Sequence, residues 1–329
     1  MFPITTRRSR GARSLTVSAP VGVRRLTRVV ETDAHEGPVY VAGEDALYFT
    51  TQRPDVAIKR LALDGGRFPL GPGRIRTIRG AANMANGMAL GVEGRLVVCE
   101  QGTLWRPAAI TRVDRATGSA ETLVDQWLGL RLNSPNDVVV KRDGTIWFTD
   151  PSYGHLQGFR PPPQVGDHVY RYDPRSGALA VVADGFDKPN GLAFSPDEDV
   201  LYVGDNGRPH HIVAFDVVGG GRLARRRVLA ASTPEHPDGL AVDAAGRLYV
   251  SAADGVRILD TGGDQIGLIA VPGAVNFTFG GAGGDILFVT ADDAIWAAVL
   301  DAAGPPRAPQ VGSATHDASR CPGLAAGRG

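Results

Sequence analysis

The sequence has little cysteine, no net charge and no long apolar run. Its 329 residues include only Cys99 and Cys321, too few for a disulfide framework or a cysteine-based metal site, so a reducing cytoplasm is expected. Thirty-five basic residues balance 35 acidic ones, which argues against a nucleic-acid or membrane-surface partner. No segment approaches the roughly 18 consecutive apolar residues of a membrane-spanning helix.

The two ends of the chain have little that could form a core. The N-terminal segment is basic and lacks the apolar stretch of a secretory signal, so residues 1–22 are interpreted as a disordered extension. Residues 304–329 are rich in Pro, Gly and Ala and are interpreted as a tail. A single domain is therefore expected over residues 23–303.

Helical periodicity is almost absent, and one phrase recurs instead. It consists of a polar residue, an apolar strand, an Asp/Gly-rich turn and a second strand, as in PNGLAFSPDEDVLYVGD from Pro189 and PDGLAVDAAGRLYVSA from Pro237. The apolar anchor of the second strand recurs on average every 48 residues, at Leu47, Leu96, Ile146, Leu201, Leu248 and Leu287. A second hairpin follows in most units.

Units of four short strands at this spacing are typical of propeller blades. The sequence therefore predicts an all-β, six-bladed β-propeller with four-stranded blades. A helical solenoid and a pair of separate β-domains are the alternatives, and the alternating pattern and unbroken phase disfavour them. The last unit has one strand too few, so the strand before the first repeat, residues 23–30, is expected to complete it and close the ring.

A polar residue heads the innermost strand of every unit, 10 or 11 residues before the apolar anchor. A single Asn-Gly pair would be read as a turn. Six polar residues at the same position of the repeat must instead converge on the propeller axis. They are Glu36, Asn86, Asn136, Asn190, Asp238 and Asn276. Two carboxylates and four amides form the hard-oxygen set that calcium prefers, so one divalent cation is expected there, with Zn²⁺, Mn²⁺ or Mg²⁺ as alternatives.

Several stretches carry a resemblance to a known family. EGPVY, NSPNDVVV, DGTIWFTDPSYG, KPNGLAFSPD and PDGLAVDAAGRLYV occur in this order between Glu36 and Thr290. The sequence resembles the SMP-30/gluconolactonase family of calcium-dependent six-bladed propellers, which includes regucalcin, bacterial gluconolactonases and the luciferin-regenerating enzyme. It is more distantly similar to diisopropylfluorophosphatase and the paraoxonases.

The resemblance implies roles for individual residues. Metal ligands carry over to Glu36, Asn190 and Asp238, and Asn136 matches a position that binds metal in some members and substrate in others. Asn86 matches a position that lines the pocket in some bacterial relatives. Gly239 departs from relatives that offer a side-chain oxygen there, and Asn276 rests on the repeat phase alone.

The loops that follow the second strand of each unit should surround the ring. They supply candidate substrate-binding residues, namely Glu100, Trp105, Asp150 and Tyr153, and a candidate proton shuttle, His155. The alternatives are loop hydrogen bonding for Asp150 and Asp205, packing for Tyr153 and Trp105, and an ordinary loop histidine for His155. The stretch FRPPPQ within residues 150–167 is suited to a lid.

These features favour a metal-dependent hydrolase that opens a lactone or related ester of a small molecule. Catalysis is assigned to Asp238 as general base, with Asn136 and Asn190 orienting the substrate; a nucleophilic role for Asp238 is the competing mechanism. The sequence has no G-x-S-x-G or H-E-x-x-H motif, which argues against a serine hydrolase of that type and against a zincin metalloprotease. Alternatives are a propeller that binds or rearranges a small molecule without hydrolysis, a phosphotriesterase-like hydrolase, or an interaction scaffold. A monomer or weak homo-oligomer is expected.

Overall fold

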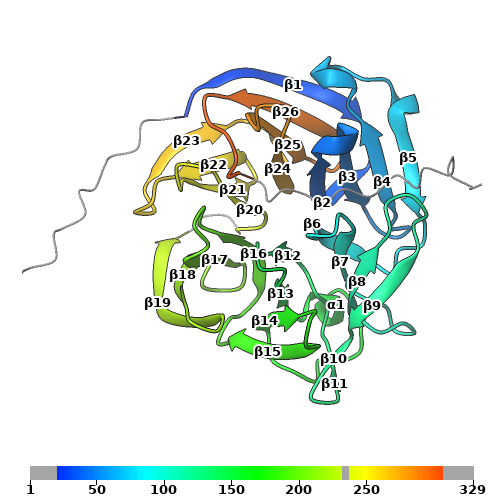
Figure 1. The fold of residues 1–329 in the computed structure, drawn as a ribbon, viewed down its shortest axis with the longest axis vertical. Coiled ribbons are helices and arrows are strands. Elements are labelled where there is room, and N and C mark those ends of the chain that lie inside the picture. The colour runs from blue at the N-terminus through cyan, green and yellow to red at the C-terminus, as the bar shows by residue number, and fades with distance from the viewer. Residues whose placement is uncertain (1–20, 232–236, 307–329) are drawn as a thin grey trace, which may run out of the picture.

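The chain forms six four-stranded antiparallel sheets arranged radially around a central axis (Figure 1). The computed structural model describes residues 21–231 and 237–306. The predictions for residues 1–20 and 307–329, including Cys321, lie outside the described residues. Within the described residues, the predicted six-bladed all-β propeller is confirmed.

Each of the first three blades is built from consecutive strands, from the axis outward. The strands of blade 1 are β2 (Ala34–Val41), β3 (Ala46–Thr51), β4 (Ile58–Ala62) and β5 (Ile75–Arg79). Those of blade 2 are β6 (Ala85–Leu90), β7 (Leu96–Glu100), β8 (Ala109–Val113) and β9 (Ala120–Val124). Those of blade 3 are β12 (Val138–Val140), β13 (Ile146–Asp150), β14 (His168–Asp173) and β15 (Ala178–Ala183).

The remaining blades follow the same order, except that the last one borrows a strand. Blade 4 contains β16 (Pro189–Phe194), β17 (Val200–Asp205), β18 (His211–Val218) and β19 (Arg222–Ala231). Blade 5 contains β20 (Leu240–Val242), β21 (Leu248–Ala252), β22 (Gly255–Leu259) and β23 (Gln265–Ile269). Blade 6 contains β24 (Asn276–Gly280), β25 (Ile286–Thr290), β26 (Ala294–Leu300) and β1 (Val23–Glu31).

The N-terminal strand closes the propeller. Strand β1 pairs antiparallel with β26, with Thr27 opposite Ala297, so the edge strand predicted for residues 23–30 is confirmed. Val29 is fully buried, and its carbonyl accepts a hydrogen bond from the Leu70 backbone N–H at 2.6 Å. Closure therefore joins the first and last parts of the propeller through backbone pairing and apolar burial.

The apolar core lies mainly between neighbouring blades. The innermost and second strands alternate their side chains between the two faces of each blade, and both faces are covered. Tyr48 of blade 1 packs with Met88 of blade 2, and Trp147 of blade 3 lies edge-on to Phe194 of blade 4 with ring centroids 5.3 Å apart. This packing fixes the relative position of the innermost strands and so of the residues that head them.

Helical structure is limited to short segments. Helix α1 (Tyr153–Leu156) lies in the long loop between β13 and β14, and three single 3-10 turns occur in blade 1, at Ala42–Glu44, Asp64–Gly66 and Pro72–Arg74. A two-stranded hairpin, β10 (Gln126–Trp127) and β11 (Leu130–Arg131), precedes blade 3. None of the helices in the described part of the chain has the length and apolar character to cross a bilayer.

Candidate active site

The six polar residues predicted to converge on the axis head the innermost strands. Glu36, Asn86, Asn190 and Asn276 lie in β2, β6, β16 and β24, while Asn136 and Asp238 lie two residues before β12 and β20. The Asn276 Nδ2 donates a hydrogen bond to Glu36 Oε2 at 2.8 Å, which joins blades 6 and 1. We refer to these six residues as the axial ring.

Glycines after the ring residues allow neighbouring blades to approach. The Gly87 N–H donates to the Asn136 carbonyl at 2.8 Å, and the Gly191 N–H donates to the Asp238 carbonyl at 3.1 Å. A Cβ on Gly87 would lie 2.6 Å from the first carbonyl oxygen, and one on Gly191 would lie 2.1 Å from the second. The recurring Asn-Gly pair is therefore required by contact between blades and does not form a hairpin turn.

Threonines on second strands complete this arrangement. The Thr50 hydroxyl donates to the Asn86 carbonyl at 3.1 Å, and the Thr149 hydroxyl donates to the Asn190 carbonyl at 2.8 Å. Both threonines are fully buried. These hydrogen bonds hold the backbones of Asn86 and Asn190 in place without using their side chains.

The two ring carboxylates lie in an environment that disfavours their charge. Glu36 is 3% exposed, and its Oε2 accepts hydrogen bonds from the Gly37 N–H at 2.9 Å and from Asn276. Burial and the neighbouring Asp137 raise the pKa of Glu36 to about 7. Burial and the charge of Glu36 raise the pKa of Asp238 to about 7, although Asp238 is only partly buried. Two negative groups thus share one site with little solvent.

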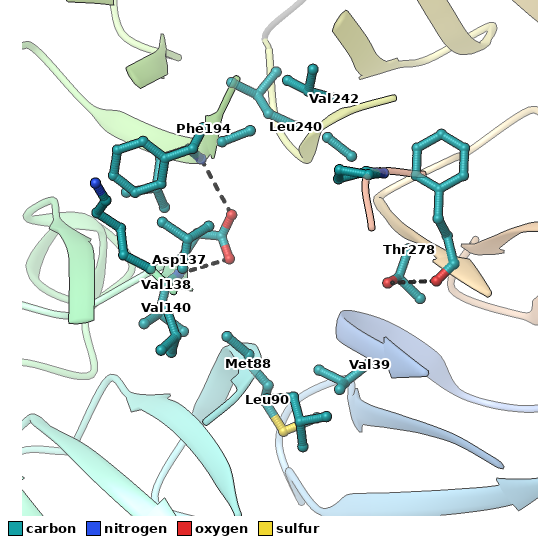
Figure 2. A pocket seen from close by; sticks show the side chains of 18 of the residues that line it. Val39, Met88, Leu90, Asp137, Val138, Val140, Phe194, Leu240, Val242 and Thr278 are labelled. Carbon is teal, nitrogen blue, oxygen red and sulfur yellow. Dashed lines mark hydrogen bonds between the residues drawn. The ribbon is translucent and has the colours of Figure 1, made fainter. Parts of the chain in front are cut away.

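A third carboxylate, Asp137, follows ring residue Asn136 and lies near the two ring carboxylates. Its Oδ1 accepts a hydrogen bond from its neighbour Val138 N–H at 2.9 Å, and its Oδ2 accepts one from Leu192 N–H at 3.4 Å (Figure 2). Burial raises the pKa of Asp137 to about 7, with the charge of Asp238 adding to the shift. Asp137 occupies the place where glycine follows the ring residue in four other blades, a departure that could have drawn attention to it.

The donor set of the ring fits a hard cation. The Asn136 Oδ1 is buried and has no hydrogen-bond partner, so a ligand oxygen is available beside the ring carboxylates. Amide and carboxylate oxygens are suitable ligands for calcium, and a divalent cation would offset the repulsion between Glu36 and Asp238. Within the described ranges, no group of three or more His, Cys, Asp or Glu side chains is arranged as a metal site. The predicted ligand set has two carboxylates and two amides, so it does not contain three side chains of these types.

A histidine–aspartate pair at the same end of the axis was missed by the sequence reasoning. The His35 Nδ1 lies 2.6 Å from Asp292 Oδ1, and the two residues are 257 positions apart. Burial opposes the charged imidazole, but Asp292, Glu36 and Asp238 outweigh it and raise the pKa of His35. Only its position directly before Glu36 could have drawn attention to His35.

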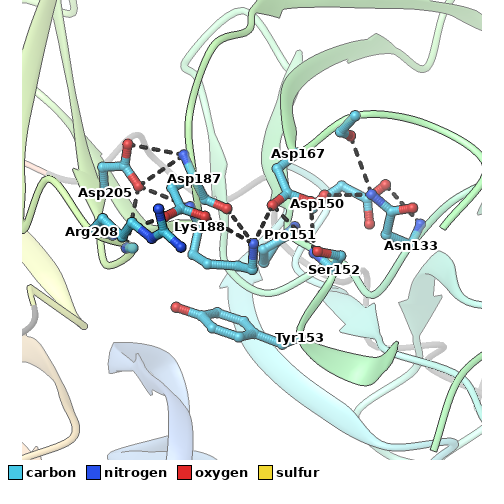
Figure 3. A network of polar contacts seen from close by, with 12 residues as sticks. Asn133, Asp150, Pro151, Ser152, Tyr153, Asp167, Asp187, Lys188, Asp205 and Arg208 are labelled. Carbon is cyan, nitrogen blue, oxygen red and sulfur yellow. Dashed lines mark hydrogen bonds and ion pairs between the residues drawn. The ribbon is translucent and has the colours of Figure 1, made fainter. Parts of the chain in front are cut away.

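The loop between β13 and β14 brings Tyr153 to the ring. The Tyr153 hydroxyl lies 3.5 Å from Asn190 Nδ2, and burial and the charge of Asp238 raise its pKa, so the phenol stays protonated. Figure 3 shows the polar network beside Tyr153, in which the Lys188 Nζ donates to Asp167 Oδ2 at 2.8 Å. Asp167 Oδ1 in turn accepts a hydrogen bond from the Ser152 N–H at 2.9 Å. Lys188, two residues before Asn190, thereby anchors the segment that carries Tyr153.

Other predicted residues have structural partners. Asp150 is fully buried and accepts hydrogen bonds from the Asn133 and Ser134 N–H groups at 2.9 and 2.8 Å; burial raises its pKa to about 7. Glu100 accepts from Asn83 and Thr111 and pairs with Arg79, its three partners being 2.9–3.0 Å away. Asp205 similarly accepts from the backbone of residues 187 and 188. The loop hydrogen-bonding alternative thus describes the contacts of Asp150 and Asp205.

The last two predicted residues lie at the surface. Trp105 is 91% exposed, on the loop after β7, and lines a cleft that includes none of the ring residues. His155 is exposed in α1, and among the described residues its side chain has no hydrogen bond to the ring. The structure therefore brings Tyr153 close to the ring, whereas Trp105 and His155 remain peripheral.

The central channel continues beyond the ring as an apolar cavity of about 380 Å³ (Figure 2). Its wall is formed by residues farther along the innermost strands, including Val39, Met88, Leu240 and Val242. Asp137 and Asn276 lie at its boundary with the ring. Lys141, Arg142 and Glu198 also line this cavity, away from the ring.

The fold and ring define a propeller with an oxygen-rich site at one end of its axis. Residues 34–293 match the SMP-30/Gluconolactonase/LRE-like region, and the chain belongs to that family. A gluconolactonase from Zymomonas mobilis is 32% identical over 78% of this chain and 74% of its own length. The structure of a gluconolactonase from Xanthomonas campestris is 34% identical, with a TM-score of 0.74 over 89% of this chain and 99% of that one.

More distant structures share the fold. Regucalcin from Agrobacterium tumefaciens, described as a calcium-binding protein, is 18% identical with a TM-score of 0.68 over 88% of this chain and 97% of that chain. The family expected from the sequence motifs is confirmed by the match over residues 34–293.

Proposed function

We propose that this protein hydrolyses a small-molecule lactone at the axial ring, with one bound divalent cation, preferably calcium. The lactonase class is supported by the relatives named gluconolactonase. The observation that carries the site assignment is the unpartnered, buried Asn136 Oδ1 beside carboxylates whose pKa values are raised to about 7. Such a site has oxygen ligands and more negative than positive charge, which are complementary to a hard cation.

Four side chains would hold the ion: Glu36, Asn136, Asn190 and Asp238. The cation, when bound, would polarise the lactone carbonyl and stabilise negative charge developing on its oxygen. Ion binding would also favour the ionised forms of Glu36 and Asp238, because an adjacent positive charge lowers a carboxyl pKa.

Asp238 is the better general base of the two ring carboxylates. Glu36 is almost inaccessible, and two hydrogen bonds to its Oε2 fix it, whereas Asp238 is partly exposed. Asp238 accepts a proton as water attacks the carbonyl carbon, and the C–O bond of the lactone then breaks. Asp238 returns this proton to the departing alkoxide, so the product is a hydroxy acid and Asp238 is ionised again.

Tyr153 is suited to orient the substrate. Its pKa is raised, so the hydroxyl remains a hydrogen-bond donor at neutral pH. Its position near Asn190 lets the phenol and the amide contact oxygens of the same substrate. Asn86 belongs to the same ring and has its Nδ2 directed to the Asn136 carbonyl at 3.1 Å, which leaves its side-chain oxygen available.

A chelator-reversible assay tests this function. Purified protein is assayed on sugar lactones and aryl esters, treated with EDTA, and assayed again after calcium is restored. We expect hydrolysis to be lost with EDTA and recovered with calcium. Hydrolysis that is indifferent to chelation would refute the metal assignment, and absence of hydrolysis across both substrate sets would refute the lactonase assignment. The predicted cytoplasmic location and monomeric or weakly oligomeric state stay predictions.

A further inference from the structure

A second cleft, of about 250 Å³, lies beside the loop that carries Tyr153. Three segments form it: the loop after β7, residues 131–133 at the end of β11, and the proline-rich part of the β13–β14 loop. It is separate from the apolar cavity of the channel, with which it shares no lining residue. The residues that give it chemical character are Trp105, Arg106, Arg131, Arg160 and the prolines 161–163.

The lining of this cleft carries positive charge only. It includes three arginines and no aspartate or glutamate. Arg160 is 6% exposed, and its guanidinium donates to four backbone carbonyls at 2.9–3.1 Å, those of Thr103, Arg106, Leu132 and Asn133. It forms no ion pair with a described residue. Since a guanidinium stays protonated in proteins, Arg160 places a buried positive charge in the cleft, and the nearby Asp150, which attracts it, does not line the cleft.

The other two arginines lie nearer the opening. Arg106 is exposed and makes no ion pair within the described part of the chain. Arg131 pairs with Asp125, which does not line the cleft. The Gln164 Oε1 accepts a hydrogen bond from the Arg131 backbone N–H at 2.8 Å, so its amide NH₂ remains a possible donor to a ligand. Positively charged and neutral donors therefore predominate at the cleft surface.

We propose that this cleft binds an anionic group, a phosphate or a carboxylate, carried by a ring-shaped small molecule. Arginine pairs with both groups through paired N–H donors, and the buried charge of Arg160 provides electrostatic attraction that solvent screens poorly. The exposed Trp105 ring and the prolines 161–163 supply flat apolar surfaces for the uncharged part of the ligand.

The cleft is connected to the candidate active site through the backbone. The Arg160 N–H donates to the Gly154 carbonyl at 3.0 Å, and Gly154 directly follows Tyr153. A Cβ on Gly154 would lie 2.2 Å from the Arg160 Cγ, so the two segments are in tight contact. The anionic group can therefore belong to the lactone substrate itself or to a separate molecule bound beside it.

Titration calorimetry with inorganic phosphate tests the binding site without requiring catalysis. Phosphate is titrated into the full-length protein without added calcium, with sodium chloride at equal ionic strength as reference. We expect saturable binding that Arg106→Gln weakens about tenfold, the effect of losing one charge-assisted contact. Arg175→Gln, an exposed arginine in the β14–β15 turn, is the matched control and should bind like the wild type. Absence of saturable binding, or equal affinity of Arg106→Gln and wild type, overturns the proposal.

Kinetics then distinguish the two sources of the anion. If it belongs to the substrate, Arg106→Gln raises KM for a phosphorylated sugar lactone about tenfold more than for its neutral counterpart. If it belongs to a separate molecule, the two substrates are affected equally while phosphate binding is still weakened. Either result supports the site. Should neither lactone be hydrolysed, the lactonase proposal fails while the calorimetric result stands by itself.

Discussion

Removing strand β1 should destabilise the propeller by an amount close to its total stability. The strand pairs with β26 at seven positions, and it buries Val29 and Val30. Burial of two valines contributes about 3–6 kcal/mol at about 1.5–3 kcal/mol each. The lost ladder adds several kcal/mol at about 0.5–1.5 kcal/mol per hydrogen bond. The sum is about 7 kcal/mol or more, against a typical domain stability of about 5–15 kcal/mol.

The assay is urea denaturation of two truncated chains. Deleting residues 1–20 removes none of the described contacts and should leave the midpoint unchanged. Deleting residues 1–30 should shift the midpoint strongly or prevent recovery of folded protein, because β26 is also left as an exposed edge. Equal denaturation curves for the two truncations would refute this account of closure.

Single substitutions in the full-length chain give a finer version of the same test. Val29 is 0% exposed and Leu26 is 36% exposed on the same strand. Val29→Ala should lower the free energy of unfolding by about 1–3 kcal/mol, whereas Leu26→Ala should change it by about 0.5 kcal/mol or less. A larger effect at Leu26 would show that β1 packs with a different face inward.

Three further predictions concern the ring and its support. In EDTA the free energy of unfolding should fall as pH rises from about 4 to about 7, because the folded state holds protons on Glu36, Asp137 and Asp238 more tightly than the unfolded chain does. Thermal melts across this pH range check the prediction, and a melting temperature that rises with pH would contradict the raised pKa values. Glu36→Gln should weaken calcium binding by about tenfold or more, with activity recovered at high calcium; unchanged affinity in a calcium titration would remove Glu36 from the ligand set. Lys188→Met should lower kcat/KM about tenfold by releasing Asp167 and hence the Tyr153 segment; rates equal to those of Arg175→Gln would show that this anchor is dispensable.

The architecture could be predicted from the sequence because each blade repeats the same local pattern. The six apolar anchors lie in the second strands of the six blades, and the ring residues head the innermost strands. Such regularity compensates for the weakness of any single strand signal. Closure by β1 followed from the strand missing in the last unit.

Side-chain partners could not be predicted in the same way. His35 and Asp292 come into contact only when the propeller closes. The sequence gives no sign that Glu100 pairs with Arg79 instead of lining the pocket. The role of the Asn-Gly pair was also hidden, because it depends on the approach of the neighbouring blade's backbone at Gly87 and Gly191. These features come from contacts between blades, for which a periodic pattern gives no direction or distance.

The most direct test of the proposed chemistry is a calcium titration of Asp238→Asn during lactone hydrolysis. This variant keeps the shape and one ligand oxygen of the side chain and removes its basic function. We expect kcat to fall by about 10²-fold or more with calcium still bound, as for loss of a general base. Recovery to nearly the wild-type rate on addition of calcium would contradict the account, because Asp238 would then act only as a ligand.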